Sequence, residues 1–238
     1  MIPVRALLIP MSLFLWTLNC LAGEVARLKF DLDGDRQPEV IRLSVDGDGD
    51  FRQFSVSVRR STYKGKYFAV EGDLPEVRSI KIDYRRPERQ LLITAGQAAS
   101  CDYHILAYSH GQLIPLLTST SEGCEETPVS LGNGELEVQT WRGFWKQRDR
   151  FRLNQAGTKL TLEPATSYDV GVSAAANTDI VLDPDTCEAR NIPRGAFVRI
   201  ERYEPRQHRY LLMAPSGACG WLDEERLDNA LSEVPYAR

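Results

Sequence analysis

The chain has 238 residues, of which 42% are hydrophobic, 26% charged and 9% aromatic. This composition excludes a disordered, collagen-like or multi-span membrane protein and indicates a globular chain of one or two domains. The 29 Lys and Arg and 33 Asp and Glu residues give a formal charge of −4. A general nucleic-acid binder needs clustered cations, so this balance argues against nucleic acid as a partner.

The first 22 residues have the pattern of a secretory signal peptide. A single cation, Arg5, precedes an uncharged apolar run over residues 6–22 that ends in small residues. This run is shorter than the roughly 20 apolar residues that cross a membrane. We therefore expect cleavage after Ala22, a periplasmic or secreted protein, and no transmembrane span in the mature chain. Lipid anchoring at Cys20 is the alternative, but the two residues before that cysteine suit lipidation poorly.

Four cysteines remain after the signal is removed: Cys101, Cys124, Cys187 and Cys219. An even number outside the cytosol predicts two disulfides, for which three connectivities exist. We favour Cys101–Cys124 and Cys187–Cys219, because each pair then lies within one of the two domains predicted below. Four unpaired thiols are the alternative, which exported proteins seldom keep.

Short runs rich in Val, Ile, Phe, Tyr and Thr, separated by turn residues, predict a mostly β protein. Apolar and polar residues alternate cleanly over residues 54–58 and 80–84, which we expect to be strands. Residues 105–108 and 113–117 flank a turn and predict a hairpin. Further strands are expected at residues 135–140, 150–153, 159–162, 178–182, 196–202 and 210–214.

A domain boundary is predicted at residues 163–167, where Pro, Thr and Ser gather. We expect an antiparallel β domain over residues 23–163, either a sandwich or a set of propeller-like repeats. A smaller β domain is expected over residues 166–227, followed by a tail over residues 228–238.

An internal repeat at a spacing of 52 residues aligns Asp31 with Asp83 and predicts two strand–loop–strand units. In this alignment Arg85 stands where the first unit has Asp33, so the second unit has lost acids of the first. Chance similarity over so few positions is the alternative.

The most informative motif is an acidic loop over residues 31–39. Carboxylates at its positions 1, 3, 5 and 9, with a backbone carbonyl at position 7, suit a hard cation. The candidate metal ligands are Asp31, Asp33, Asp35, Gln37 and Glu39. The spacing resembles the calcium loops of the FG-GAP type in bacterial exported proteins, which implies calcium as the cofactor. A solvated acidic turn is the alternative, and the acidic run over residues 46–50 is expected to be a hairpin turn.

The segment over residues 166–227 resembles bacterial SH3-like domains. Gly195 precedes an alternating strand, two strands that can pair follow, and Gly220 and Trp221 stand near the end. The resemblance implies a small barrel that binds cell-wall peptides or proteins. A barrel that only packs against its neighbour is the alternative.

We expect no enzyme activity, because the chain lacks a Gly-x-Ser-x-Gly elbow, a Walker loop and a His-Glu-x-x-His helix. Cys101 and His104 come closest to a thiol–imidazole pair. Residues three apart in a strand face opposite sides of the sheet, so a disulfide cysteine beside a structural histidine is favoured.

A small, polar, acidic loop over residues 118–126, tethered by Cys124, is the candidate partner-binding element. Preorganised loops lose less entropy on binding. The candidate contact residues are Ser121, Glu122, Gly123, Glu125 and Glu126. A solvated surface loop is the alternative.

Residues 24–162 resemble periplasmic lysozyme inhibitors and related immunity proteins, through the acidic loop, the repeat and the segment over residues 96–103 that leads into a strand. The resemblance implies an exported, non-catalytic protein whose loop enters the cleft of a muramidase. We expect a protein partner such as a basic peptidoglycan hydrolase, towards which an acidic protein is steered. The alternative is an envelope protein whose SH3-like domain binds peptidoglycan.

Overall fold

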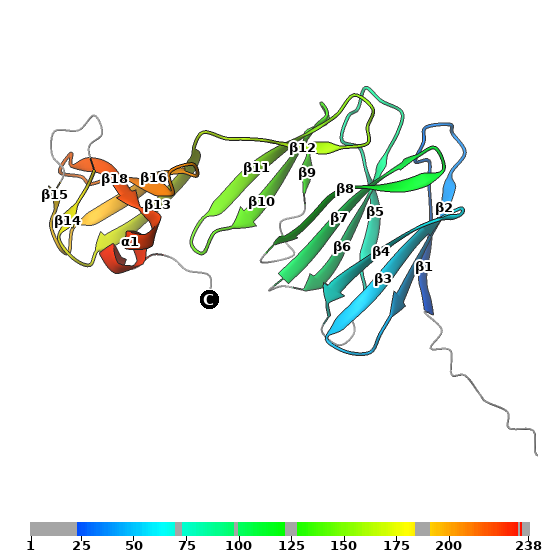
Figure 1. Ribbon diagram of the computed structural model, residues 1–238, viewed down its shortest axis with the longest axis horizontal. Coiled ribbons are helices and arrows are strands. Elements are labelled where there is room, and N and C mark those ends of the chain that lie inside the picture. The colour runs from blue at the N-terminus through cyan, green and yellow to red at the C-terminus, as the bar shows by residue number, and fades with distance from the viewer. Residues whose placement is uncertain are drawn as a thin grey trace, which may run out of the picture.

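The computed structural model describes residues 23–69, 73–97, 100–121, 128–183, 191–232 and 234. Within these residues the chain forms antiparallel sheets and one short helix, which confirms the predicted all-β class. Three four-stranded sheets lie side by side at one end of an elongated molecule, and a curled five-stranded sheet forms the other end (Figure 1). No helix among the described residues is long and apolar enough to cross a membrane.

The first sheet is a meander of four strands that follow one another in the chain. They are β1 (Gly23–Phe30), β2 (Glu39–Asp46), β3 (Phe51–Val58) and β4 (Ser61–Phe68). The strand predicted at residues 54–58 lies in β3 and is confirmed. Alternate residues of β3 are buried, because Phe54, Val56 and Val58 face the second sheet.

The second sheet is the middle layer of the stack. Its strands are β5 (Glu76–Ile80), β6 (Gln90–Gln97), β7 (Ser100–Ser109) and β8 (Gln112–Ser121). Leu91 and Ile93 pack in the core shared with the first sheet, whereas Leu92 packs in the core shared with the third. This sheet is therefore apolar on both faces. The hairpin predicted over residues 105–117 is confirmed, with its turn at His110 and Gly111.

The strand predicted over residues 80–84 is wrong beyond its first residue. β5 ends at Ile80, and the chain continues as a loop. Ile82 is fully buried within this loop, and its backbone N–H donates to the side chain of Gln90 at 3.1 Å. The alternation of apolar and polar residues here therefore comes from a loop residue whose side chain fills the core. The side-chain oxygen of Gln90 accepts the hydrogen bond that a neighbouring strand would accept in a sheet.

The third sheet is another meander. Its strands are β9 (Val129–Ser130), β10 (Glu135–Trp141), β11 (Lys146–Leu153) and β12 (Leu160–Glu163). The strands predicted at residues 135–140, 150–153 and 159–162 are confirmed, the last beginning one residue later. Leu136 and Val138 pack with residues of β6, β7 and β8, which joins this sheet to the middle layer.

The repeated strand–loop–strand units are β1–β2 and β5–β6, but their register differs from the predicted one. Phe30 pairs with Glu39 at the mouth of the first loop, and Ile80 pairs with Gln90 at the mouth of the second. In each loop the second residue is fully buried, as Leu32 shows in the first. The alignment of Asp31 with Asp83 is therefore wrong: strand pairing makes Asp33 the counterpart of Asp83.

The curled sheet has the strand order β18-β17-β16-β13-β19, with a separate two-stranded ribbon of β14 and β15. The elements are β13 (Tyr168–Ala176), β14 (Ile180–Val181), β15 (Asn191–Ile192), β16 (Phe197–Glu204), β17 (Arg209–Met213), β18 (Cys219–Asp223), α1 (Glu224–Ala230) and β19 (Leu231–Ser232).

Two of the three strands predicted in this part, at residues 196–202 and 210–214, correspond to β16 and β17. The strand predicted at residues 178–182 shortens to the two residues of β14. The end of α1 and all of β19 occupy residues that the sequence placed in a tail. Leu227 and Ala230 anchor α1 by packing into the core of the curled sheet.

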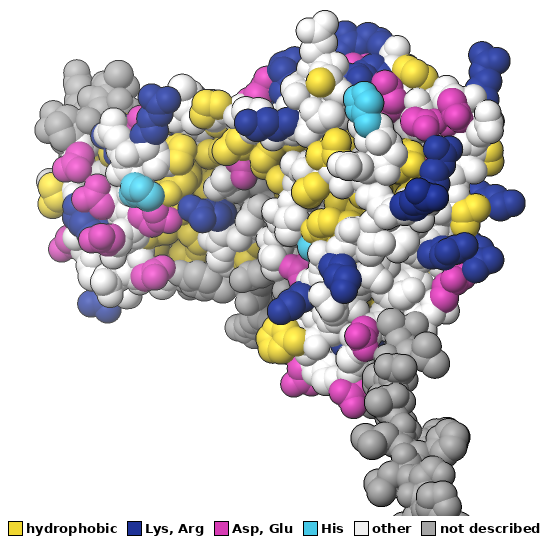
Figure 2. Space-filling view, turned by 45° about the vertical axis from the view of Figure 1, so that its right-hand side comes forward, with side chains coloured by type: hydrophobic (Ala, Val, Ile, Leu, Met, Phe, Trp, Pro, Cys, Tyr) yellow, Lys and Arg dark blue, Asp and Glu magenta, His cyan; other side chains and the backbone are white. Residues whose placement is uncertain are grey.

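The turn between β10 and β11 joins the two ends of the molecule. Phe144 and Trp145 lie in this turn, yet both belong to the hydrophobic core of the curled sheet. The indole N–H of Trp145 donates to the hydroxyl of Tyr210 at 3.3 Å, and its ring packs against Tyr203. Figure 2 shows hydrophobic side chains gathered where the molecule narrows between its two ends.

Candidate cation site

The acidic loop connects β1 to β2, and one buried residue fixes its shape. Leu32 is fully buried, and its backbone N–H donates to Oε2 of Glu39 at 2.9 Å. Gly34 has φ +79°, and a Cβ there would lie 2.4 Å from Cβ of Pro87 in the second loop. Only glycine fits this close approach in a left-handed conformation.

The loop brings three of the four predicted carboxylates together. Ligand oxygens of Asp31, Asp33 and Glu39 all lie within 4.8 Å of one another. Asp35 is not in this group, and its carboxylate accepts a hydrogen bond from the backbone N–H of Gln37 at 2.7 Å. The cluster therefore contains the acids at positions 1, 3 and 9 of the loop. The acid at position 5, Asp35, instead supports the turn through its hydrogen bond.

Backbone N–H groups hold the carboxylates in place without an ion. Asp31 accepts hydrogen bonds from the N–H groups of Gly34 at 2.9 Å and Arg36 at 3.1 Å. Asp33 accepts one from Asp35 at 3.2 Å. A carboxylate oxygen has two lone pairs, so these bonds leave capacity for a cation. Hard oxygen donors arranged in this way suit calcium.

Arg59 is a site residue that sequence reasoning missed. Its Nη2 donates to Oε1 of Glu39 at 2.8 Å, and the Glu39 side chain is fully buried whereas that of Arg59 is 57% exposed. The positive charge of the guanidinium neutralises that carboxylate and so reduces the net negative charge of the three-residue cluster. No local signal marks Arg59, because it lies in the turn between β3 and β4 and reaches Glu39 through strand pairing.

The second loop places an arginine beside the counterpart of Asp33. Nε and Nη2 of Arg85 each donate to the carboxylate of Asp83 at 2.9 Å, and this ion pair lowers the pKa of Asp83. Arg85 also donates to the carbonyl of Asn133. The same position of the repeat thus pairs with an arginine in the second loop, whereas Asp33 in the first accepts only a backbone hydrogen bond among the described residues.

Neither protein-family models, nor curated protein sequences, nor solved structures match this chain. The function must therefore be argued from its own residues.

Cys101 and His104 do not face each other, so they form the arrangement that the sequence favours, a disulfide cysteine near a structural histidine, and not a thiol–imidazole pair. Cys101 packs towards the third sheet, whereas His104 faces the first sheet and contacts Tyr63 and Phe54. Opposite faces were expected for residues three apart in one strand. His104 is buried, and this burial lowers its pKa.

Cys101 and Cys219 are both disulfide-bonded. Cys124 and Cys187 lie outside the described residues, so the predicted pairing stays a prediction. The candidate partner-binding residues Glu122, Gly123, Glu125 and Glu126 also lie outside the described part of the chain. Ser121 is the last residue of β8.

Proposed function

We propose that the chain is an exported, periplasmic calcium-binding protein that binds and inhibits a protein partner such as a peptidoglycan hydrolase. The observation that carries the calcium part is the convergence of Asp31, Asp33 and Glu39 in a loop held open by backbone hydrogen bonds. Calcium stabilises the loop between β1 and β2, and the protein acts by binding rather than by catalysis.

The three meander sheets support the propeller-like alternative of the predicted fold. Each has four antiparallel strands in chain order, and the first two have equivalent loops between their first and second strands. In this interpretation each sheet is one blade-like unit that buries its apolar face against the next. The acidic loop is then the cation-binding member of a repeated loop position.

Calcium binding is tested by thermal unfolding of the mature protein with calcium or with a chelator. An ion at 100 times its Kd stabilises the folded state by about 2.7 kcal/mol, so the midpoint rises measurably. Asp33→Asn keeps the side-chain shape and removes the charge, and it abolishes this rise. Asp48→Asn is the matched control, because it changes an acid in the turn after β2. An unchanged wild-type midpoint at saturating calcium would refute the site.

The inhibitory role is tested with the purified mature protein and a basic peptidoglycan hydrolase from the same envelope. Co-purification at a one-to-one ratio and loss of lytic activity support the proposal. The loop variant Glu122→Ala, Glu125→Ala, Glu126→Ala weakens this complex. A hydrolase that keeps full activity at saturating protein refutes inhibition.

A second candidate is an envelope protein whose curled domain is SH3-like and binds peptidoglycan. The favouring observation is the surface of β16, β17 and β18, where Phe197 is 65% exposed and the guanidinium of Arg209 lies 4.3 Å from the ring of Trp221. Retention of the protein by purified sacculi in the absence of any hydrolase favours this candidate. Loss of that retention in Trp221→Ala would assign it to the curled sheet.

A further inference from the structure

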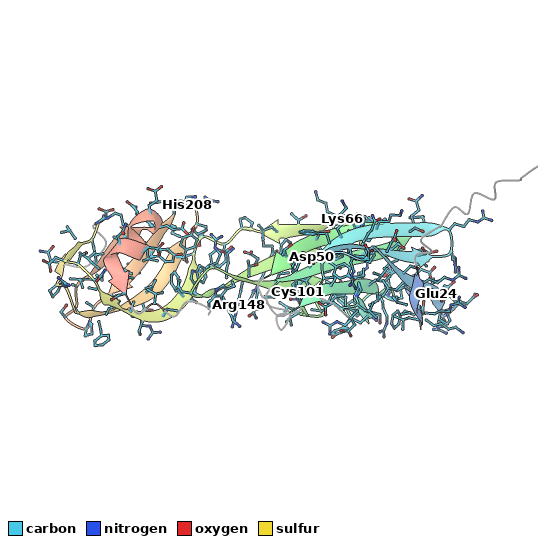
Figure 3. All side chains as sticks on the ribbon, turned by 90° about the horizontal axis from the view of Figure 1, so that it is seen from below. Glu24, Asp50, Lys66, Cys101, Arg148 and His208 are labelled. Atoms are coloured by element: carbon cyan, nitrogen blue, oxygen red, sulfur yellow. The ribbon has the colours of Figure 1, made fainter. Side chains whose placement is uncertain are left out.

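A groove runs between the third sheet and the curled sheet. Its volume is about 870 Å³, which lies in the range of functional ligand sites. One wall carries Arg148 and Arg150 from β11, and the other is the start of β13. Figure 3 places Arg148 at the narrow junction between the two ends of the molecule.

The β13 wall is an open strand edge. Tyr168, Asp169 and Val170 all line the groove. They lie at a register shift in the pairing of β13 with β16, between Asp169 and Val172, where side chains do not alternate strictly between the two faces. The groove therefore follows this stretch of the β13 edge. Among the described strands, β13 pairs on this side only with β19, and only at Ala175 and Ala176. The backbone groups over residues 168–174 that point away from β16 thus have no strand partner among the described residues and can pair with another strand.

The β11 wall offers hydrogen-bond donors. Side chains of Arg148 and Arg150 are 66% and 59% exposed, and both share one carboxylate, Glu137, at 3.9 Å. Neither guanidinium donates a hydrogen bond to any described residue at that distance. The nearby carboxylate of Glu163 already accepts a hydrogen bond from Arg152. The groups on this wall that can still form hydrogen bonds are therefore the positively charged guanidinium groups of Arg148 and Arg150. The opposite wall carries a carboxylate, Asp169.

The two walls are held at a fixed spacing. The hydroxyl of Tyr168 at the start of β13 donates to Asp149 of β11 at 2.6 Å. The ring of Tyr168 also packs against Trp145, which is anchored in the curled core. A groove whose walls are already connected loses little entropy when it binds an extended chain.

We propose that this groove binds an extended, acidic peptide segment of a partner protein, which adds as a strand to the free edge of β13. Strand addition takes its affinity from backbone hydrogen bonds and its specificity from alternate side chains. Arg148 and Arg150 are two residues apart in a strand, which separates them by about 7 Å. Acidic residues at alternate positions of an extended peptide have the same spacing. This inference does not rest on the calcium site or on the loop at residues 122–126.

The test uses the mature protein, in chelator, with a fluorescein-labelled octapeptide of alternating glutamate and valine. We expect saturable binding with Kd below about 100 µM, weakened by added salt. Arg148→Ala with Arg150→Ala weakens it by about tenfold or more. Arg199→Ala is the matched control, because Arg199 is also 59% exposed but lies on β16, outside the groove.

Two further probes separate charge from strand addition. The alternating lysine–valine octapeptide does not bind, and a glutamate–valine peptide that is N-methylated at every second residue loses binding because it lacks donors on one edge. Equal binding of the lysine peptide, or of the N-methylated peptide, would overturn the proposal. So would soluble peptidoglycan fragments that bind through Arg148 and Arg150 while both peptides fail, since the groove would then be a glycan site.

Discussion

The hydroxyl of Tyr63 lies 2.9 Å from Nδ1 of His104, across the interface between the first and second sheets. The ring of Phe54 covers the imidazole edge-on at 5.0 Å, and Nε2 of His104 is buried with no hydrogen-bond partner among the residues that the structure describes. An imidazolium at this position would place a charge in an apolar interface. The interface between the first two sheets therefore requires a neutral histidine.

Acid is expected to weaken the fold through His104. Burial lowers the pKa of this residue below its ordinary value of 6.5, and the weaker attraction of Asp102 opposes the shift. The unfolded chain then binds a proton that the folded chain excludes. Stability is full above pH 6.5 and falls as the pH drops from 6.5 towards the folded pKa, by at most about 1.4 kcal/mol per pH unit.

Guanidinium unfolding at pH 7.5, 6.5 and 5.5 measures this effect. His104→Gln removes the pH-dependent component, whereas His110→Asn keeps it, because His110 lies in the exposed turn between β7 and β8. Asparagine also tolerates the positive φ of that turn. Parallel pH profiles for wild type and His104→Gln would contradict the assignment.

The ion pair of Glu39 and Arg59 gives a second prediction. Arg59→Ala leaves a fully buried carboxylate whose remaining hydrogen-bond donor among the described residues is the N–H of Leu32, and we expect a loss of about 1–3 kcal/mol in unfolding free energy. The exposed guanidinium keeps this figure below that for a fully buried pair. If calcium binds at the site, the variant recovers more stability from calcium than wild type does. Chemical denaturation with and without calcium measures both quantities.

Arg60→Ala provides the control for that experiment. Arg60 is the exposed neighbour of Arg59 in the same turn. Its removal is expected to change stability by less than about 0.5 kcal/mol. Equal losses in the two variants would show that the turn as a whole, and not the contact with Glu39, supports the loop.

The strands that alternate in sequence could be predicted because one face of each is buried against a neighbouring sheet. Residues 54–58 are an example. Residues 105–108 do not alternate, because both faces of β7 are buried there, and they could be predicted from the turn that follows them. Alternation fails at Ile82, because a loop residue that fills the core has the same local pattern as a strand residue. The helix α1 has seven residues, which is too short for a helical period to stand out.

The residues of the candidate site also fall into two groups, those that the sequence indicates and those that only the fold brings together. Asp31, Asp33 and Glu39 could be identified because a single loop carries all three and their spacing is local. Arg59 could not, since it reaches Glu39 only once the pairing of Ile41 with Val58 has set the register of β2 and β3. The groove beside β13 depends on how two separate sheets pack together, so no local pattern indicates it.

Gly65 tests the packing of the first sheet. It pairs with Phe54 across β3 and β4, and a Cβ at position 65 would lie 2.3 Å from the buried Phe54 ring. Gly65→Ala must therefore displace a fully buried aromatic side chain, and we expect a loss of about 1–3 kcal/mol. Gly49→Ala is the control, because nothing lies within 4 Å of a Cβ there. Similar denaturation midpoints for both variants would contradict this packing.

Trp145 connects the third sheet to the curled sheet and gives the last prediction. Trp145→Ala removes a buried ring from a core that includes Tyr203 and Tyr210, and we expect a loss of about 3–5 kcal/mol. Trp145→Phe keeps most of the packing and removes the hydrogen bond to Tyr210, so its loss is smaller.

How the loss of stability in Trp145→Ala is shared between the two ends of the molecule distinguishes a residue that couples them from an ordinary core residue. Because the ring belongs to the hairpin of one end and to the core of the other, Trp145→Ala is expected to split a single unfolding transition into two. Amide hydrogen exchange would then show early opening of β13, β16 and β17 while the middle sheet stays protected. Trp141→Ala, which removes a partly exposed ring from the same hairpin, keeps one transition. A single shifted transition in Trp145→Ala would mean that the two ends are coupled by other contacts.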